Sequence, residues 1–375
     1  MDMLNTTKRK YILLYLILAI CMFSSFFFVQ HNHSFYDRPI AKVVDTKLED
    51  QKKLVDMYEN EDVLYRQQVI AEMQNGQHKG ERISLINEYS NSGGYDQEYR
   101  VGNELFVSFQ SSQEEGAMLK GNIEDVKRDK FLLLTAWFFV LVLVLVGKKQ
   151  GIYSIVSLVV NAMLLSYALT IYMKSSNISL VLICGISAIL FTVISLLLVN
   201  GRNEKSYAAV ISTLLGTLAL MLITYLVIGA TSGNGLRYED MQFLTRPPEV
   251  VFTAGILVGS LGAVMDIAIT MSSSIFSLYE KKPNISVKAL VASGMDIGKD
   301  IMGTMTNILF FAYVSGSIPI LILYFMNASP FGYTLSLTLS LELARALAGG
   351  IGIVLTIPIG LYVSIFFVNR KRARA

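Results

Sequence analysis

Residues 131–147 read FLLLTAWFFVLVLVLVG, an apolar run without a single charged side chain. Beyond Lys148 and Lys149, residues 152–173 read IYSIVSLVVNAMLLSYALTIYM, a second run of the same kind. An α-helix rises about 1.5 Å per residue, so about 20 apolar residues cross the ~30 Å hydrocarbon core of a bilayer. The two runs therefore predict a pair of transmembrane helices joined by a short basic turn.

Similar runs recur along most of the chain. They lie at residues 11–29, 178–199, 208–230, 250–278, 304–326 and 346–368. The 375 residues are 53% hydrophobic and only 16% charged, whereas soluble domains carry about 25% charged residues. These features predict a polytopic α-helical membrane protein with about eight transmembrane helices. We expect residues 1–30 to form the N-terminus and first helix, and residues 130–375 to form a membrane domain of about seven helices.

Basic residues gather in the loops on one side of this threading. They are Lys8, Arg9, Lys10, Lys148, Lys149, Arg202, Lys205, Lys281, Lys282, Lys288, Arg370, Lys371, Arg372 and Arg374. Because short cytoplasmic loops are rich in Lys and Arg, both termini are predicted to be cytoplasmic and residues 31–129 to lie outside. We interpret the first run as an uncleaved anchor, because residues 30–33 offer no small-residue cleavage site.

Residues 31–129 are predicted to form a β-rich extracytoplasmic domain. Short apolar or alternating segments are separated there by the turn signals Asn75-Gly76, Lys79-Gly80 and Gly102-Asn103. About 100 residues suffice for one small core, so we expect a small barrel of the OB or SH3-like type.

No cofactor, metal or nucleic acid is predicted as a ligand. His31 and His33 lack further metal ligands nearby, which favours a solvated linker over a metal site. Cys21 and Cys184 lie within apolar runs and do not suggest a disulfide framework. The net charge of +3 is small and scattered, so the sequence does not indicate binding to nucleic acid.

Asp266 lies near the middle of the run at residues 250–278. Small or polar residues recur around it at steps of three and four, which places them on one face of a helix. They are Gly255, Gly259, Gly262, Asp266, Thr270, Ser273 and Ser277. Glycine faces most often pack against other helices, but a carboxylate at mid-membrane costs ~2.5–3.5 kcal/mol. Asp266 is therefore a candidate functional residue, with an ion pair to Lys299 as the structural alternative.

The polar pattern recurs in the segment that leads into residues 304–326. Asp296, Lys299, Asp300, Gly303, Thr304 and Asn307 again follow three-and-four spacing. Residues 288–303 are interpreted as an interfacial or re-entrant helix that brings Asp296 and Asp300 toward Asp266. The polar-stripe segments thus cover residues 250–310 and 331–368.

The last segment, residues 331–368, is too long for one straight span. Gly349, Gly350 and Pro358 predict a break or kink. Glu342 and Arg345, spaced i,i+3, share a helix face and form either a gate or a structural ion pair.

Three stretches carry a resemblance to a known family. They are GSLGAVMDIAITMSSS at residues 259–274, GMDIGKDIMGTMTNILFFAY at residues 294–313 and ELARALAGGIGIVLTIP at residues 342–358. The sequence resembles the YibE/F-like membrane protein family over most of its length. The resemblance implies a polytopic plasma-membrane protein of Gram-positive type bacteria, with a permease-like build and a shorter YibE/F-like partner. It does not identify a substrate.

The leading functional hypothesis is a permease or secondary transporter component for an unknown ion or small molecule, coupled to protons or another ion. An intramembrane acidic cluster would bind the ion or substrate, with neutral ligands beside it. The cluster and its ligands are Asp266, Thr270, Ser273, Asp296, Lys299, Asp300 and Asn307. The absence of a GxxxxGK[ST] motif argues against an ATP-driven pump.

Two alternatives stay open. A non-transporting scaffold or regulatory protein would use the outer domain to bind a partner. An intramembrane aspartyl protease is the remote alternative, because Gly294-Met295-Asp296 only superficially resembles a Gly-x-Gly-Asp site. We therefore expect a protein that is not an enzyme. Its expected partners are the lipid bilayer and, as open options, the shorter family member and further copies of itself.

Overall fold

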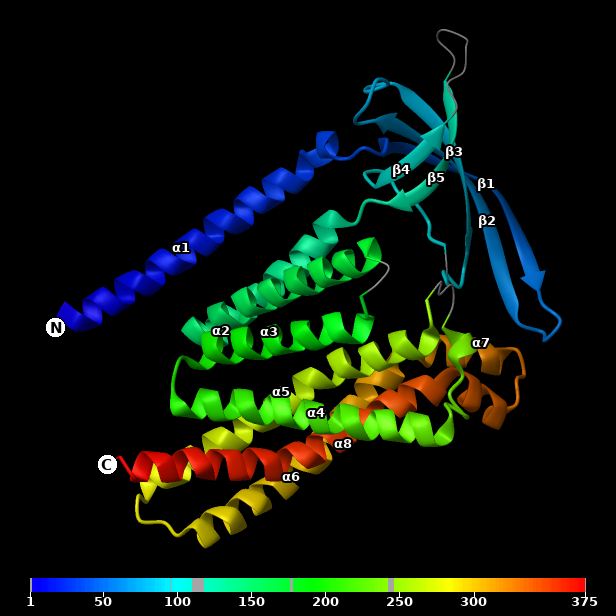
Figure 1. Cartoon of the computed structure of the whole chain (residues 1–375). Helices are drawn as coiled ribbons and strands as arrows, with labels where there is room; N and C mark the ends of the chain where they lie inside the picture. Colours follow the sequence, from blue (N-terminus) through cyan, green and yellow to red (C-terminus); the bar gives the residue numbers. More distant parts are fainter. Residues whose placement is uncertain (1, 95, 110–117, 176–177, 242–245, 375) are drawn as a thin grey trace. The chain divides into compact units, whose positions relative to one another are not determined.

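A computed structural model describes residues 2–94, 96–109, 118–175, 178–241 and 246–374; at residues 2–12, 14 and 240 it describes the backbone alone. The chain forms two compact units, Met1–Val142 and Leu143–Ala375. The first holds a β domain with the helices that enter and leave it, and the second holds a helical bundle (Figure 1).

Five strands close the β domain into a barrel. The strands are β1 (Ile40–Val55), β2 (Glu61–Met73), β3 (Arg82–Ser90), β4 (Glu104–Phe109) and β5 (Leu119–Val126). Their order around the barrel is β1-β2-β3-β5-β4, and the β3–β5 pair is the one parallel pairing among the described strands. Alternate apolar residues, among them Val43, Val69, Ile83, Leu85 and Leu105, point into a buried apolar core. The prediction of a small N-terminal β domain is confirmed, whereas the OB or SH3-like type stays a prediction.

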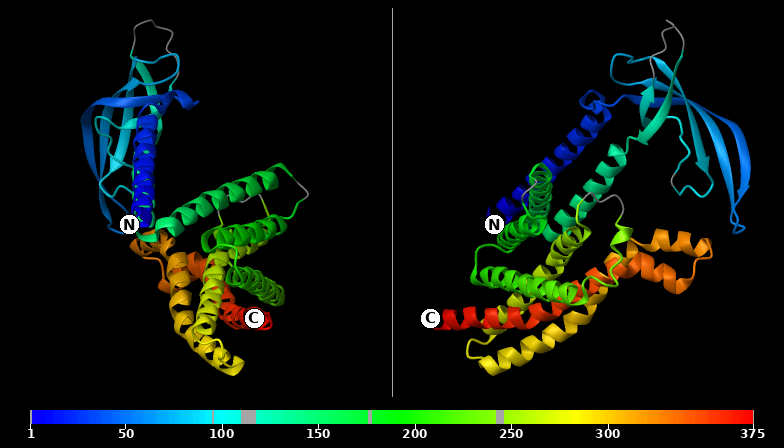
Figure 2. Two further views of the ribbon diagram at one scale, coloured as in Figure 1. Left: turned by 90° about the vertical axis from the view of Figure 1, so that its left-hand side faces the viewer. Right: turned by 45° about the vertical axis from the view of Figure 1, so that its right-hand side comes forward.

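The β1–β2 pair extends beyond the barrel as a ribbon (Figure 2). β1 pairs with β2 from Ala41 to Val55, but β4 pairs with β1 only at residues 40–42. β3 in turn meets β2 only from Leu64 onward. Every residue from Lys47 to Glu59 is consequently exposed.

Helices α1 (Asp2–Gln30) and α2 (Asp129–Lys174) flank the β domain, with the short 3-10 helix η1 (Asn32–Phe35) after α1. α2 has non-helical angles at Lys148 (φ 48°, ψ −121°), between the two apolar runs expected there. A positive φ is costly for lysine and interrupts the helical hydrogen bonds, so the chain changes direction at this residue.

Five further long helices and one short helix form the bundle. They are α3 (Leu180–Asn200), α4 (Glu204–Thr231), α5 (Pro248–Lys281), α6 (Val287–Ser315), α7 (Ile318–Met326) and α8 (Phe331–Arg372), with the short 3-10 helix η2 (Tyr238–Asp240) between α4 and α5. α4, α5 and α8 pack together, α6 packs along α8, and α3 packs against α5. Small residues allow the close approach. Gly216 faces Thr356, Gly294 faces Leu361 and Gly298 faces Ile357.

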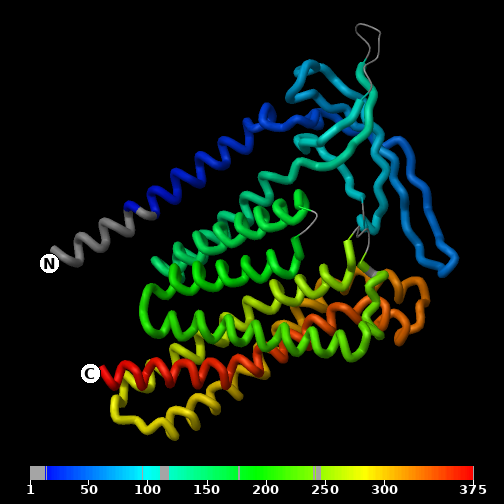
Figure 3. Tube along the Cα trace, in the orientation of Figure 1, coloured from blue at the N-terminus to red at the C-terminus, as the bar shows by residue number. Residues whose placement is uncertain are grey.

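Within the described residues, five helices are long and apolar enough to cross a membrane, or six if α6 and α7 count as one bent span. The axes of α6 and α7 differ by 53° (Figure 3). In α1 the described apolar part, Tyr15–Gln30, is shorter. The expected membrane-helix character is confirmed, and the count of about eight spans stays a prediction.

Two local expectations differ from the structure. Residues 288–303 continue as one helix into residues 304–315, and the bend follows at Ser315–Ile318. A break or kink was expected near Gly349 and Pro358. The break is absent, because α8 runs unbroken from Phe331 to Arg372 with Pro358 inside it, and the kink stays a prediction. Neighbouring helices pack closely around this part of α8, and such packing lets a transmembrane helix tolerate glycine and proline.

Candidate functional site

The polar stripe of α5 lies opposite the face that packs into the bundle. The buried face contains Ile256, Ser260, Val264, Ile267, Met271 and Ile275. On the opposite side Gly255, Gly259, Gly262, Asp266 and Ser277 are exposed, and Thr270 and Ser273 are half-buried. The spacing predicted one shared face, and from Gly262 to Ser277 that face is exposed or half-buried, whereas its end at Gly255 and Gly259 lies beside other helices.

One end of the stripe lies against α6 and α8. A Cβ added at Gly259 would overlap the Tyr313 hydroxyl, which is buried and has no hydrogen-bond partner among the described residues. A Cβ added at Gly255 would lie 3.9 Å from Nε of Arg345. The glycines therefore leave room for a phenol and a guanidinium group beside the stripe.

Arg345 and Glu342 form an ion pair on α8 at this end. Both side chains are about one-fifth exposed. The Arg345 guanidinium also lies over the Phe252 ring of α5, 5.4 Å from its centroid. This pair thus contacts α5 next to the stripe, where a gate was expected.

The other end of the stripe reaches a pocket. Ser277 and Glu280 continue the three-and-four spacing after Ser273, and both line a pocket of about 510 Å³. The remaining lining residues are Asn203, Glu204, Lys205, Phe276 and Lys371, from α4, α5, α8 and the turn before α4. Oε2 of Glu204 is buried there, without a hydrogen-bond partner in the part of the chain that the structure describes. The sequence analysis did not foresee this pocket, because its walls come from three distant segments.

The polar residues of α6 also lie away from its packed face. Asp296, Lys299, Asp300 and Asn307 are exposed, whereas Leu290, Gly294, Gly298 and Leu309 are buried. Lys299 lies 3.7 Å from Asp296 on the same helix. Among the described residues Asp266 makes no hydrogen bond or ion pair, so the structure joins Lys299 to Asp296 and not to Asp266.

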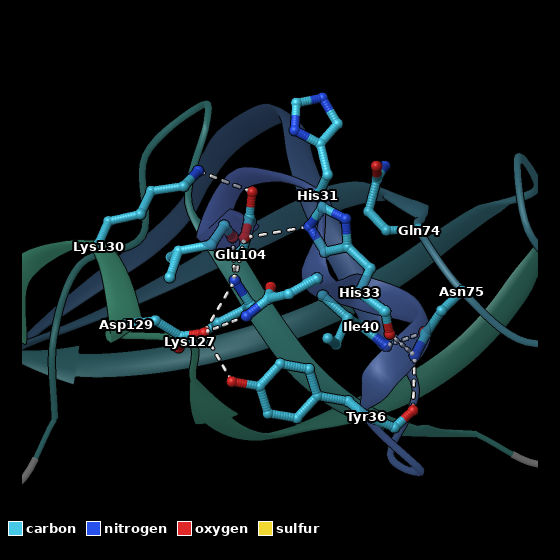
Figure 4. Close-up of polar contacts among 12 residues, drawn as sticks. His31, His33, Tyr36, Ile40, Gln74, Asn75, Glu104, Lys127, Asp129 and Lys130 are labelled. Carbon is cyan, nitrogen blue, oxygen red and sulfur yellow. Dashed lines mark hydrogen bonds and ion pairs between the residues drawn. The ribbon is translucent and has the colours of Figure 1, made fainter. Parts of the chain in front are cut away.

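A second polar cluster lies where the β domain meets its two flanking helices (Figure 4). Lys127 Nζ lies 3.2 Å from Oε2 of Glu104 and 3.2 Å from Oδ2 of Asp129, and donates to the Val29 carbonyl of α1. Lys130 Nζ lies 2.9 Å from the other Glu104 oxygen. One buried ammonium group thus joins the end of α1, the start of α2 and strand β4.

The charges of this cluster shift the pKa values of its members. Burial raises the pKa of Glu104, but the hydrogen bonds from Lys130 and Lys127 outweigh it and hold the pKa below its ordinary value. The hydrogen bond that Tyr36 donates to Asp129, together with burial, raises the pKa of Tyr36 to about 12. At neutral pH Glu104 and Asp129 are therefore both carboxylates, and Tyr36 is a neutral phenol.

His33 takes part in this cluster, whereas a solvated linker was expected. Its Nε2 lies 3.2 Å from Oε2 of Glu104, and its side chain is 16% exposed. No group of three His, Cys, Asp or Glu side chains that could hold a metal occurs among the described residues. The sequence analysis did not predict this cluster; the signal that could have indicated it is the basic and acidic run at residues 127–130, directly before an apolar stretch.

Comparison with known families covers nearly the whole chain. The model of the YibE/F-like proteins matches residues 135–370, and the model of the YibE/F family N-terminal domain matches residues 34–126. The boundary between the two matches coincides with the start of α2. No curated protein and no solved structure matches the chain.

Proposed function

We propose that this chain, which belongs to the YibE/F-like protein family, is a component of a membrane permease or secondary transporter. Its cargo is a small molecule or an ion, and the coupling ion binds to carboxylates within the membrane. The β domain lies outside, both termini lie in the cytoplasm, and the membrane is the bacterial plasma membrane. The positively charged loops support this orientation.

In this proposal the chain crosses the bilayer about eight times. The crossings come from α1, the two halves of α2, α3, α4, α5, the bent pair α6–α7, and α8. The kink at Lys148 supports two crossings in α2, because a basic residue at the bend suits a short loop. The five strands and the β3-β5-β4 order support an OB-type barrel outside.

The observation that carries the proposal is the surroundings of Asp266. Its carboxylate lies on the face of α5 turned away from the bundle and has no partner among the described residues. A carboxylate cannot face lipid tails without a large cost, so it requires water, an ion or another protein surface. From Asp266 the polar face continues for 14 residues, or ~21 Å, to Glu280 in the pocket.

The candidate binding residues of the two stripes and the Glu342–Arg345 pair have the following roles in this proposal. Asp266 on α5 and Asp296 and Asp300 on α6 bind the coupling ion or proton at separate carboxylates, since they form no three-carboxylate group among the described residues. Lys299 lies beside Asp296 and partly neutralises it. Thr270, Ser273 and Asn307 supply neutral ligands. Glu342 and Arg345 form the gate at the outer end, and the pocket around Glu280 is the cytoplasmic mouth.

The test is water access along α5. In a chain with Cys21→Ala and Cys184→Ala, single cysteines replace Gly262, Asp266, Ser273 or Ser277. A membrane-impermeant thiol reagent is applied to cells and to inverted vesicles. Ala268→Cys is the matched control, because Ala268 is fully buried on the packed face of the same helix.

We expect labelling of the stripe positions, with rates that rise toward Ser277 in inverted vesicles, and protection of the Ala268→Cys variant. Protection of all stripe positions would contradict a hydrated path. The stripe would then be a packing surface, and the scaffold hypothesis would replace transport.

We treat the chain as a binding and transport protein and not as an enzyme. A shorter member of the same family is the partner we would look for first, by co-purification. A scaffold that acts through the β domain would be favoured by the following pair of results in a strain that lacks the native gene. Deletion of residues 36–125 would fail to restore the phenotype of that strain, whereas Asp266→Asn would restore it fully.

A further inference from the structure

The outer edge of β1 is open over most of its length. In the described part of the chain, β4 covers this edge only at residues 40–42, and no strand covers it from Asp45 to Val55. The N–H of Gln51 donates to its neighbour Asp50 (2.8 Å), a local acceptor in place of a strand. An open edge of this length is a template for pairing with another strand.

The ribbon also lacks support from its faces. All residues from Lys47 to Glu59 are exposed. β3 pairs with β2 as far as Leu64, which lies opposite Lys52, so the ribbon consists of β1 and β2 alone only at residues 53–55 and 61–63. A two-stranded tip is marginally stable in water, and a strand added along β1 would extend over this one and stabilise it.

The charges along the edge select the partner. Residues 48–54 read Leu-Glu-Asp-Gln-Lys-Lys-Leu, in which acids and bases are arranged symmetrically about Gln51. If a second β1 pairs antiparallel with Gln51 opposite Gln51, then Asp50 faces Lys52, Glu49 faces Lys53 and Leu48 faces Leu54. Opposite charges directly across two strands stabilise the pair, and like charges destabilise it.

We propose that this edge binds a second copy of the same chain, with the two β1 strands antiparallel about Gln51. Lysines on an edge normally prevent strand pairing, but in this register an acid faces each of Lys52 and Lys53. Glu49 is a bulge residue that already lies 3.4 Å from Arg66, so the Asp50–Lys52 pairs contribute most. The contact joins two copies that their membrane helices hold in the same bilayer.

The first test is a disulfide at the symmetry axis, in full-length chains with Cys21→Ala and Cys184→Ala. Paired residues in an antiparallel sheet have Cα atoms ~5.5 Å apart, which a disulfide can bridge. We expect Gln51→Cys to form covalent dimers in native membranes under mild oxidation. Lys47→Cys is the positional control, because its two copies would lie ~27 Å apart.

The second test reverses charges in the Gln51→Cys background. Lys52→Glu alone and Asp50→Lys alone place like charges opposite each other, so each should lose most of the cross-linking. Co-expression of the two, with different tags, restores opposite charges and should restore cross-linking between the tags. Lys47→Glu, which faces Val55, is the matched charge control and should cross-link normally.

Equal cross-linking of the Gln51→Cys and Lys47→Cys variants would overturn the proposal. The proposal would also be overturned if Lys52→Glu left cross-linking unchanged, or if co-expressed Lys52→Glu and Asp50→Lys chains did not cross-link with each other. Because Asp50 and Lys52 are exposed, unchanged protein level and melting temperature of each variant would show that the chain still folds.

Discussion

The Lys127 ammonium lies 3.2 Å from the Glu104 carboxylate, with side chains that are 1% and 6% exposed. The same ammonium contacts Asp129 and the Val29 carbonyl, so one cation holds together three segments of the chain. A buried ion pair contributes little net stability relative to an apolar pair, but its geometry is specific. The cluster therefore sets how the β domain joins its first two helices.

Lys127→Met should destabilise the chain by about 3–5 kcal/mol, because it removes the buried ammonium group that neutralises the charge of the buried Glu104 carboxylate. Lys130→Met removes a cation from the same carboxylate, but Lys130 is 41% exposed and should cost no more than about 1 kcal/mol. Thermal unfolding of the detergent-solubilised chain measures both. Equal effects of the two variants would contradict the assignment of Lys127 as the central cation.

The cluster should weaken in acid. Because the folded state lowers the pKa of Glu104, its contribution to stability is complete above the ordinary carboxyl pKa of about 4.3. It is lost as the pH falls through the lower pKa of the folded state. The one tryptophan, Trp137 of α2, donates to Ser25 of α1 and reports on this region by fluorescence. In Glu104→Gln the acid-induced change in Trp137 emission should be smaller than in the native chain.

Gly298→Val should destabilise the bundle by about 1–3 kcal/mol, because the new side chain would overlap Ile357 of α8. Gly303→Val, on the same helix, meets open space and should have a much smaller effect. The melting temperatures of the two variants test the packing of α6 on α8. A larger loss for Gly303→Val would indicate that the exposed face of α6 is covered in the native membrane.

Asp266→Asn should change the free energy of unfolding by no more than about 0.5 kcal/mol, because Asp266 has no partner among the described residues. The melting temperature should therefore stay nearly the same. A structural ion pair with Lys299 would predict a clear loss instead. Comparison with Lys299→Met decides between them, since two partners of one pair should show similar losses that do not add.

Glu342→Gln should destabilise α8 more than the double variant Glu342→Gln/Arg345→Gln. The single change leaves a partly buried guanidinium without its carboxylate. A double-mutant cycle on the free energies of unfolding should give a coupling energy of about 0.5–3 kcal/mol between the two side chains. If the pair is also a gate, Glu342→Gln should speed up labelling of the Gly262→Cys variant from outside.

The sequence alone was sufficient for properties that depend on neighbouring residues. Apolar runs such as residues 131–147 predict membrane helices because burial in lipid depends on local composition. Turn signals at Gly76, Gly80 and Gly102 coincide with positive φ angles, which favour glycine at those places. The shared face of Gly255, Asp266 and Ser277 follows from helical periodicity alone.

The tertiary structure decided everything that depends on which segments meet. Periodicity placed Asp266 on a polar face, but only the packing of α5 against α4 and α8 shows that this face points away from the bundle. The pocket at Glu280 and the cluster around Lys127 each join segments that are far apart in the sequence. The spacing of residues along a helix determines which side chains share a face, whereas the neighbours of that face depend on contacts between distant segments.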